Sequence, residues 1–502
     1  IKSFDYNFLL EGDNLHSLYL LEKTHKGKID VIYIDPPYNT GNKDFVYDDK
    51  FVDSEDGYRH SKWLSFMQKR LIIAKGLLSD NGAIFISIDD NECVNLELLC
   101  NLIFGEVNKI ANLPRTIKRG GKSTDKIAKN HDNLLIYSKN ALSTKFNKII
   151  IEDDQTKNLK DEYYSERGSY RLNQCLDYDS LQYNESMDYE IEIDGEKFYA
   201  GGSYEYWLER HNGHHKKIDW VWRWSKSLFE WGYKNGFVVM KKGKRKRIYT
   251  KTYSDCKIDK DSNGNYCIVK SMNSKVYDSL FYTDNIFSND NGKKEFDKLN
   301  IKTKFDYPKP TALIRECIKM IANENYSTIL DFFAGSGTTA QAVLELNKED
   351  GGNRKFILCT NNENNICEEV TYQRIKTVIT GTREDGSEYS NGIPANLKYY
   401  KTDFIEKSID NLDDELNKHT KELVQLENYV DIDDKNVLLA FDNKGLTTLL
   451  KDADIKKIQK VYISRFVILN SEQKKLLKNK KIEVIPDYYF RKELKEKGLN
   501  WR

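Results

Sequence analysis

Short apolar runs alternate with segments of helical periodicity in the first third of the chain. Residues 29–34 are mostly apolar, and the run stops at Asp35-Pro36-Pro37. Because neither proline can continue a strand ladder, the run predicts a buried strand that delivers its carboxyl end to a loop. The other elements predicted in this region are a helix over residues 61–78 and strands over 83–88 and 133–137.

The alternation of strands and helices is interrupted and then resumes. From residue 141 to 300 tyrosine, lysine, aspartate and glycine dominate and apolar runs are short, which indicates an inserted domain. Residues 1–140 and 301–400 are therefore predicted to form two halves of one α/β core, with a mainly parallel sheet covered on both faces. The elements predicted in the second half are helices over 311–322 and 338–346 and strands over 328–333 and 355–360.

The last hundred residues, 401–502, predict a helix followed by a small α/β appendage. Four leucines lie along one side of the helix predicted for residues 411–430, and they suit either contact with a partner or burial within the same chain. The leucines are Leu412, Leu416, Leu423 and Leu426, and the strands predicted beyond them cover 437–441, 461–464 and 481–485.

Composition narrows the class of protein. The 502 residues carry 79 lysines and arginines against 78 acids, so the chain is not a uniformly basic nucleic-acid coat. Apolar runs fall far short of the roughly 20 residues of a membrane span, and no signal peptide opens the sequence, so we expect a cytoplasmic protein of bacterial type. The eight cysteines are scattered without paired spacing, and His211, His214 and His215 lack a second cluster, so we expect no bound metal.

A glycine-rich turn follows the strand predicted for residues 328–333. Gly335 and Gly337 allow a sharp bend and close approach of a ligand, and Ser336, Thr338 and the amides of the next helix can bind an anionic group such as a carboxylate. The turn lacks the Gly-Lys-Ser/Thr of a phosphate-binding loop and the third glycine of a dinucleotide fingerprint. Glu363, after the next strand, lies where a ribose-binding carboxylate is expected.

The Asp35-Pro36-Pro37-Tyr38 loop has a definite chemical use. The exocyclic amine of adenine is a weak nucleophile, and an enzyme that alkylates it must accept hydrogen bonds from both amino hydrogens. The Asp35 carboxylate and the Pro36 carbonyl can do this from one rigid loop. Tyr38 offers a flat face on which a flipped-out base can stack, an interaction worth about 1–3 kcal/mol.

Two segments carry a family resemblance. Asp35-Pro36-Pro37-Tyr38-Asn39-Thr40-Gly41 and Phe333-Ala334-Gly335-Ser336-Gly337-Thr338 resemble the catalytic and cofactor motifs of amino-group DNA methyltransferases. The catalytic motif comes first, which is similar to the β class and to the modification subunits of type III restriction systems. Gly12-Asp13-Asn14 and residues 305–311 resemble further cofactor segments, and residues 131–140 a segment beside the base pocket. The short stretch ahead of Asp35 departs from longer type III subunits.

The resemblance implies a Rossmann-like core that transfers a methyl group from S-adenosylmethionine to the N6 amine of a flipped-out adenine in double-stranded DNA. Residues 141–300 would be the target-recognition domain. The resemblance further implies a homodimer and a possible restriction (helicase-nuclease) subunit as a partner. The catalytic residues it implies are Asp35, Pro36, Pro37 and Tyr38, and the cofactor-binding residues are Asp13, Lys309, Asp331, Phe333, Gly335, Ser336, Gly337, Thr338 and Glu363.

Two basic stretches are candidates for contacts with DNA phosphates, which orient a duplex without reading its bases. The first lies in residues 115–129 and the second in 241–247, and either can also be solvated surface. The candidates are Arg115, Lys118, Arg119 and Lys122 in the first stretch and Lys241, Lys244, Arg245 and Arg247 in the second. Four tryptophans between residues 220 and 231 are predicted to fill the core of the inserted domain instead.

Alternatives to adenine methylation stay open at this point. The same pair of acceptors serves the N4 amine of cytosine, although aspartate at the start of the loop favours adenine in this family. RNA or a protein glutamine amide is a further substrate for Pro-Pro-Tyr chemistry. A non-enzymatic DNA-binding subunit with an inactive core is the remaining alternative, against which the intact Asp35, Tyr38, Gly335 and Gly337 argue.

Overall fold

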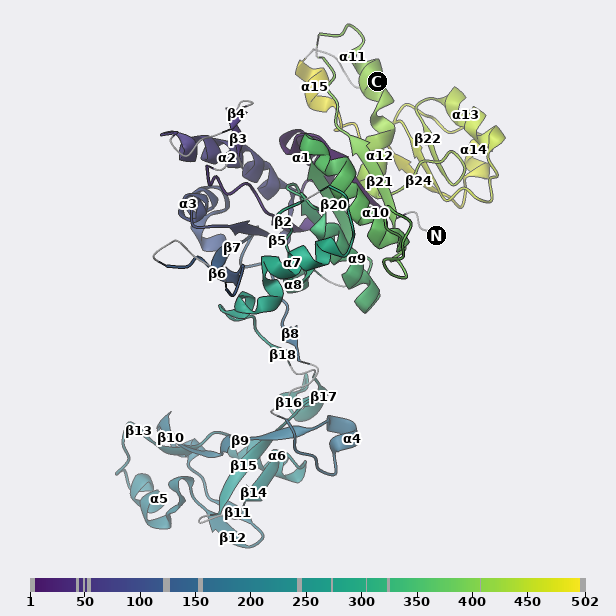
Figure 1. Cartoon of the computed structure of the whole chain (residues 1–502). Coiled ribbons are helices and arrows are strands. Elements are labelled where there is room, and N and C mark those ends of the chain that lie inside the picture. The colour runs from purple at the N-terminus through teal and green to yellow at the C-terminus, as the bar shows by residue number, and fades with distance from the viewer. Residues whose placement is uncertain are drawn as a thin grey trace. The chain divides into compact units, whose positions relative to one another are not determined.

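The computed structural model divides the chain into two compact units (Figure 1), and each is described by itself. The larger unit comprises residues 1–147 and 278–502, and the smaller comprises 148–277. The predicted insertion of 141–300 is therefore wider than the smaller unit, and residues 401–502 belong to the larger one. The structure describes residues 5–41, 45–47, 50–51, 56–120, 127–151, 157–241, 246–271, 274–303, 305–322, 326–406 and 408–496.

The larger unit is built on a mixed sheet whose order, within the described residues, is β21-β1-β20-β19-β2-β5-β7-β6. Neighbours from β21 to β5 are parallel, and β7 is antiparallel to both β5 and β6. This confirms the predicted α/β class with a mainly parallel sheet. The strands are β1 (Tyr6–Glu11), β2 (Ile29–Ile34), β5 (Leu78–Ile88), β6 (Lys109–Thr116), β7 (His131–Ser138), β19 (Thr328–Asp331), β20 (Lys355–Thr360) and β21 (Asn396–Lys401).

The central strands β2, β19 and β20 are buried on both faces, which explains why they are nearly continuous apolar runs. Phe8 and Leu10 of β1 pack into a cluster with side chains of α1, α2, α3 and α12, whereas Leu9 between them is buried outside that cluster. Helix α8 packs on β2, and helix α9 packs on β20. The helices are α1 (Asn14–His25), α2 (Arg59–Leu77), α3 (Cys93–Phe104), α7 (Asn289–Asp297), α8 (Thr311–Ile321), α9 (Thr338–Asp350), α10 (Tyr372–Thr380), α11 (Leu412–Lys418) and α12 (Thr420–Asn428).

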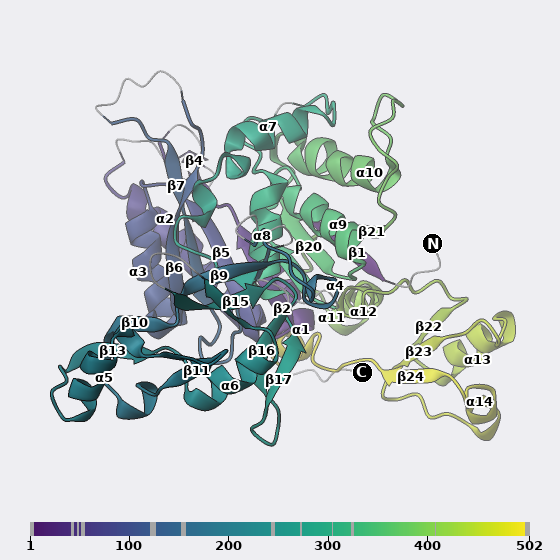
Figure 2. The ribbon, with the colours of Figure 1, turned by 90° about the horizontal axis from the view of Figure 1, so that it is seen from below.

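The C-terminal part contains a three-stranded parallel sheet, β22-β23-β24, with α13 and α14 beside it (Figure 2). Its strands begin and end within one residue of the predicted ones. The predicted helix over 411–430 is instead two helices, α11 and α12, separated at His419. Its four leucines are buried within the chain. The elements are β22 (Val437–Ala440), α13 (Asn443–Asp452), β23 (Lys460–Ile463), α14 (Ser471–Leu476), β24 (Lys481–Val484) and α15 (Arg491–Glu496).

The smaller unit is made of short antiparallel pairs, with β14-β15-β9 as its three-stranded sheet. Trp222 is buried in its core, and Trp220, Trp224 and Trp231 pack partly buried against core clusters, as predicted. Its elements are β8 (Ile149–Ile150), α4 (Tyr164–Arg167), β9 (Tyr170–Cys175), β10 (Asp177–Gln182), β11 (Ile191–Ile193), β12 (Glu196–Phe198), α5 (Tyr204–His211), β13 (Ile218–Trp222), α6 (Lys226–Lys234), β14 (Val238–Lys241), β15 (Arg247–Tyr253), β16 (Cys256–Lys260), β17 (Tyr266–Lys270) and β18 (Ser274–Lys275).

Two short strands, β3 (Val46–Tyr47) and β4 (Lys50–Phe51), pair antiparallel in the larger unit. One local prediction was wrong: the strand after the helix over 61–78 was expected to begin at residue 83, with Asp80-Asn81-Gly82 ending the helix, but β5 begins at Leu78. The pairing of β2 with β5 shifts register between Ile29 and Val31, which accommodates these extra residues. Within the described part of the chain, no helix combines the length and apolar character needed to cross a membrane.

Candidate active site

Two loops that are far apart in the sequence lie at the same edge of the central sheet. β2 ends at Ile34 and β19 ends at Asp331, and the two strands are adjacent and parallel, with Val31 opposite Ile329. From β19 the chain continues to β20 on one side, whereas β2 continues to β5 on the other. Open α/β sheets bind ligands outside the carboxyl ends of their strands at such a reversal. The Asp35 loop and the Gly335 turn are therefore at the position where this fold forms a site.

A buried tryptophan binds the backbone of the Asp35 loop. Trp63, on α2, is fully buried, and its indole Nε1 donates a hydrogen bond of 2.8 Å to the carbonyl oxygen of Pro37. Pro36 is buried, and the two prolines restrict the backbone on either side of their bond. The sequence indicated the prolines as the stiffening element, and the contact from Trp63 was not predicted. Burial of the indole and its hydrogen bond orient the loop independently of any ligand.

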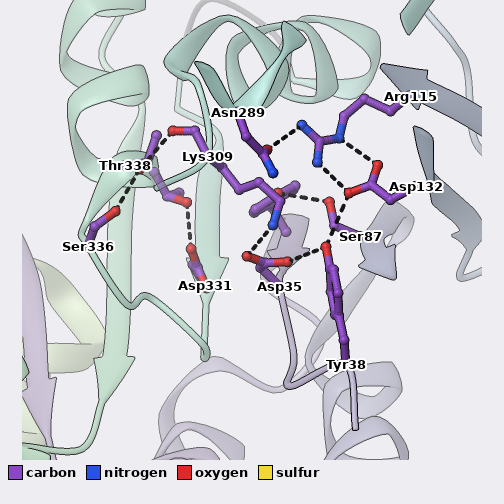
Figure 3. Close-up of polar contacts among 12 residues, drawn as sticks. Asp35, Tyr38, Ser87, Arg115, Asp132, Asn289, Lys309, Asp331, Ser336 and Thr338 are labelled. Atoms are coloured by element: carbon purple, nitrogen blue, oxygen red, sulfur yellow. Dashed lines mark hydrogen bonds and ion pairs between the residues drawn. The ribbon is translucent and has the colours of Figure 1, made fainter. Parts of the chain in front are cut away.

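Lys309 connects the two loops directly (Figure 3). Its ammonium Nζ donates to Oδ2 of Asp35 at 2.6 Å, and its backbone carbonyl accepts from the hydroxyl of Thr338 at 3.2 Å. The Lys309 side chain is 7% exposed and that of Asp35 is 25% exposed. The resemblance placed Lys309 among the cofactor-binding residues. In the structure its charged end lies on the carboxylate assigned to catalysis.

Tyr38 lies between two carboxylates. Its hydroxyl is 3.0 Å from Oδ1 of Asp35 and 3.2 Å from Oδ2 of Asp132, on β7. Burial raises the pKa of the Tyr38 phenol well above its ordinary value, and the charges of Asp35 and Asp132 raise it further. The phenol therefore keeps its proton at neutral pH and acts as a hydrogen-bond donor.

Arg115 belongs to the same group, which corrects its assignment as a phosphate contact. The side chain is fully buried, and its guanidinium forms a two-pronged ion pair with Asp132. One further nitrogen of the guanidinium donates to Oδ1 of Asn289 at 3.0 Å (Figure 3). The same nitrogen donates to the carbonyl of Phe287 at 2.8 Å. A side chain without solvent exposure and with these partners is not available to a DNA phosphate.

The glycine turn requires its two glycines. Gly335 has φ +47° and Gly337 has φ +75°, a region that other residues seldom adopt. A Cβ at Gly337 would lie 3.2 Å from the Thr371 side chain, and one at Gly335 would lie 3.3 Å from the ring of Phe305. Gly337 is the N-cap of α9, so it has no side chain that could cap the amides at the start of that helix. These amides and the helix dipole favour an anion at the turn.

A buried cation supports the hydroxyl groups of this turn. Arg374, on α10, is fully buried and donates from one nitrogen to the hydroxyls of Ser336, at 3.2 Å, and Thr338, at 2.7 Å. Its Nε donates to Gln341 at 2.8 Å, while its other terminal nitrogen is buried without a hydrogen-bond partner. Burial lowers the pKa of Arg374 to about 10, so it remains charged at neutral pH. No sequence signal pointed to this residue.

Asp331 and Phe333 shape the start of the turn. Asp331 is 3% exposed and accepts hydrogen bonds from the Phe333 amide, at 3.0 Å, and from the Thr339 hydroxyl, at 2.5 Å. Burial raises the pKa of its carboxyl to about 7 despite these two donors, which lower it. The ring of Phe333 is half-buried and packs near that of Phe66. Both residues hold the turn in place from inside the fold.

The two outlying cofactor candidates are on the surface. Asp13 is exposed, caps the amides of Leu15 and His16 at the start of α1, and pairs with the buried Arg70 at 3.2 Å. Glu363 is exposed and accepts a weak hydrogen bond of 3.4 Å from the side chain of Asn361. Both follow strands of the central sheet at the same edge as Asp35, a position that suits a cofactor contact. Their assignment to cofactor binding stays a prediction.

The remaining basic candidates fall into three groups. Arg119 and Lys241 are exposed and Lys118 is half-buried. Arg247 pairs with Asp177 at 3.2 Å. Lys122, Lys244 and Arg245 lie outside the described residues. A search of the described ranges for groups of three or more His, Cys, Asp or Glu that could hold a metal ion yields none.

Comparison with known proteins gives the family. The sequence profile of the N6/N4 methyltransferase family, described as DNA methylase, matches residues 29–373. The StyLTI Mod subunit, a type III restriction-modification enzyme of Salmonella typhimurium, is 34% identical over 74% of this chain and 56% of its own length. The type II methyltransferase M.KpnI of Klebsiella pneumoniae is 32% identical over 78% of this chain and 90% of its own.

Coverage is uneven among these relatives. The chain spans between 51% and 58% of the length of four type III Mod subunits that it matches. Among solved structures, that of the M1.HpyAVI–SAM complex aligns with a TM-score of 0.32 and 13% identity over 74% of this chain and 98% of that one. The family profile covers more than half of the chain, and M.KpnI is covered almost completely. The chain therefore belongs to the DNA methylase family of amino-group (N6 and N4) methyltransferases.

Proposed function

We propose that this protein transfers a methyl group from S-adenosylmethionine to the N6 amine of a flipped-out adenine in double-stranded DNA. The observation that carries the proposal is the contact between the two loops: Lys309 bonds Asp35 with its ammonium and Thr338 with its carbonyl. This contact brings the carboxylate suited to an exocyclic amine next to the turn suited to an amino-acid carboxylate. Similarity to type III Mod subunits and to M.KpnI supports the same assignment.

The residues of the glycine turn fit the amino-acid end of S-adenosylmethionine. The charge of Arg374 and the amide end of α9 favour a carboxylate at the Ser336 and Thr338 hydroxyls. Asp13 and Glu363, as acidic groups at the ends of neighbouring strands, are assigned to the adenine and ribose parts. When bound, S-adenosylmethionine supplies a methyl group on a positively charged sulfur, which is a good leaving group.

Catalysis by the chain's own residues is then mainly a matter of positioning and polar acceptors. The Asp35 carboxylate and the Pro36 carbonyl accept the two hydrogens of the amine, which directs the nitrogen lone pair away from the ring. The Pro37 carbonyl is occupied by Trp63, so the backbone acceptor assigned to the amine is that of Pro36. The nitrogen loses one proton as its bond to carbon forms, and Asp35 is the base assigned to receive it. Tyr38 stacks on the flipped base.

The proposal extends to what the protein binds. Arg119 and Lys241, which are exposed, are assigned to DNA phosphates together with Lys118, and residues 148–277 to target recognition. The similarity to Mod subunits of type III restriction-modification enzymes supports a restriction subunit as a further partner. A homodimer is supported by α3, where Val94, Leu98 and Leu102 recur every four residues with exposed fractions of 71%, 59% and 84%.

The decisive experiment compares two carboxylate variants. The wild type, Asp35→Ala and Asp90→Ala are incubated with unmethylated plasmid DNA and S-adenosylmethionine labelled in its methyl group. Asp90 is an exposed carboxylate just beyond the neighbouring strand β5, so its loss controls for charge alone. We expect Asp35→Ala to lose methyl transfer while it still binds S-adenosylmethionine, and Asp90→Ala to keep both. Normal turnover by Asp35→Ala would refute the assignment.

The identity of the methylated base follows from the same reaction. Digestion of the product DNA to nucleosides and mass analysis distinguishes N6-methyladenine from N4-methylcytosine. We expect N6-methyladenine. A product that contains only N4-methylcytosine would assign the same residues to the cytosine reaction instead.

A further inference from the structure

The local backbone does not by itself fix the orientation of the Tyr38 side chain. It lies in a loop without regular secondary structure, three residues beyond Asp35. A ring that stacks on a base must be held at one angle, because stacking depends on parallel planes at a fixed separation. The backbone hydrogen bonds of a strand do not extend to this residue, so its position must come from side-chain contacts.

The hydroxyl of Tyr38 supplies such a contact. It has one hydrogen and two carboxylate oxygens within reach, Oδ1 of Asp35 at 3.0 Å and Oδ2 of Asp132 at 3.2 Å. The two acceptors differ in rigidity. Asp35 is partly exposed in the loop itself, whereas Asp132 is 1% exposed on β7, directly opposite Arg115 of β6 in the register of the two strands.

Asp132 cannot move without breaking a larger buried group. Arg115 binds both of its oxygens (Figure 3). Arg115 also donates to Phe287 and Asn289, which follow the inserted unit in the sequence. The Asp132 carboxylate is thus an acceptor fixed by the central sheet, outside the loop that it contacts. Hydrogen bonds to a charged acceptor in a buried place are among the stronger ones.

We propose that Asp132, held by Arg115, is a positioning residue for methyl transfer. It fixes the Tyr38 ring by accepting a hydrogen bond from the phenol hydroxyl. When Asp35 accepts a hydrogen bond from the amine of the target base, the Tyr38 hydroxyl donates to Asp132 alone. The proposal rests on the proposed function. In this proposal the role of Asp132 depends on the hydroxyl of Tyr38. If Asp132 served only as the ion-pair partner of Arg115, its role would not depend on that hydroxyl. Coupling between the two side chains is therefore the property to measure.

The test is a double-mutant cycle of Tyr38→Phe and Asp132→Asn, with kcat/KM measured for unmethylated plasmid DNA and labelled S-adenosylmethionine. Each single variant is expected to lose roughly tenfold or more, since each removes the same charge-assisted hydrogen bond. The double variant is expected to lose no more than the worse single one. Losses that multiply would overturn the proposal, because Asp132 would then act without the hydroxyl.

Tyr33→Phe is the matched control. Tyr33 is buried on β2, and its hydroxyl contacts Ser87 at 2.9 Å. Losses from Tyr33→Phe and Asp132→Asn are expected to multiply, because the Tyr33 hydroxyl is bonded elsewhere.

Two further outcomes separate this inference from the proposed function. If Asp132→Asn fails to fold, Tyr38→Phe decides, since it leaves the pair of Arg115 and Asp132 intact: an unchanged kcat/KM would overturn the proposal. A wild type that methylates no DNA would refute the proposed function and this inference with it. An active wild type with multiplying losses would refute the inference alone.

Discussion

The stability of the glycine turn should depend on pH through Asp331. Burial raises the pKa of this carboxyl from its ordinary 3.8 to about 7. The folded protein therefore holds the proton at pH values where the unfolded chain has lost it. This stabilisation is complete below about pH 3.8 and is lost as the pH rises through about 7. The wild type should accordingly lose stability in this region of the fold as the pH rises from weakly acidic to weakly alkaline.

The size of the effect follows from the two pKa values. The difference between 3.8 and about 7 corresponds to about 4 kcal/mol at about 1.36 kcal/mol per pH unit. Roughly 2–3 kcal/mol of this should appear between pH 5 and pH 8, because the carboxyl of the unfolded chain is already ionised at pH 5. Asp331→Asn keeps the shape of the side chain and removes the titrating group. The variant should lack this part of the pH dependence.

Hydrogen exchange followed by mass spectrometry on peptides from β19 and α9 is the suitable assay, since a whole-chain signal would mix the two units. After correction for intrinsic exchange rates, protection of Asp331→Asn relative to the wild type should rise roughly 30- to 150-fold from pH 5 to pH 8. Asp90→Asn, which alters an exposed carboxyl, should follow the wild type. Equal pH dependence in the wild type and Asp331→Asn would refute the argument from burial.

Two further predictions concern ligand binding and assembly. Arg374→Gln should weaken binding of S-adenosylmethionine about tenfold or more but leave binding of 5′-methylthioadenosine, which lacks the amino-acid carboxylate, unchanged; calorimetric titration with both ligands measures this, and equal losses would show that Arg374 only supports the fold. Leu98→Glu should turn dimers into monomers on size-exclusion chromatography with light scattering, whereas Leu98→Met should not, since only the glutamate places a charge on the exposed face of α3. A wild type that is monomeric, or a Leu98→Glu variant that stays dimeric, would contradict the proposed interface.

Local signals in the sequence were sufficient for the loops of the site. The run of residues 29–34 before two prolines predicted β2 to the residue, and the two glycines from which a sharp bend was predicted both have positive φ. Such features depend on backbone sterics and on apolar periodicity within a few residues. The same locality explains a wrong prediction: Asp80-Asn81-Gly82 has the composition of a turn, but pairing with β2 extends β5 through it.

Runs of charged residues in the sequence did not show which basic side chains are exposed. Arg115 was interpreted as part of a basic run, because its neighbours in sequence are lysines and arginines. The antiparallel register of β6 and β7 places it opposite Asp132 instead. No strand was predicted over residues 109–116, so Arg115 could not be placed opposite Asp132 in advance. Arg374 was missed for a similar reason, because its partners, Ser336 and Thr338, belong to another element of the fold.

By itself the sequence determined several elements of the core and the chemistry that two of its loops can offer. The tertiary structure alone decided that β2 and β19 are neighbours, and therefore that Lys309 can bond Asp35 and Thr338 at once. It also decided which ionisable side chains are buried together. The physical reason is that strand order and burial depend on how the whole chain minimises exposed apolar surface and unpaired polar groups, and no short segment contains that information.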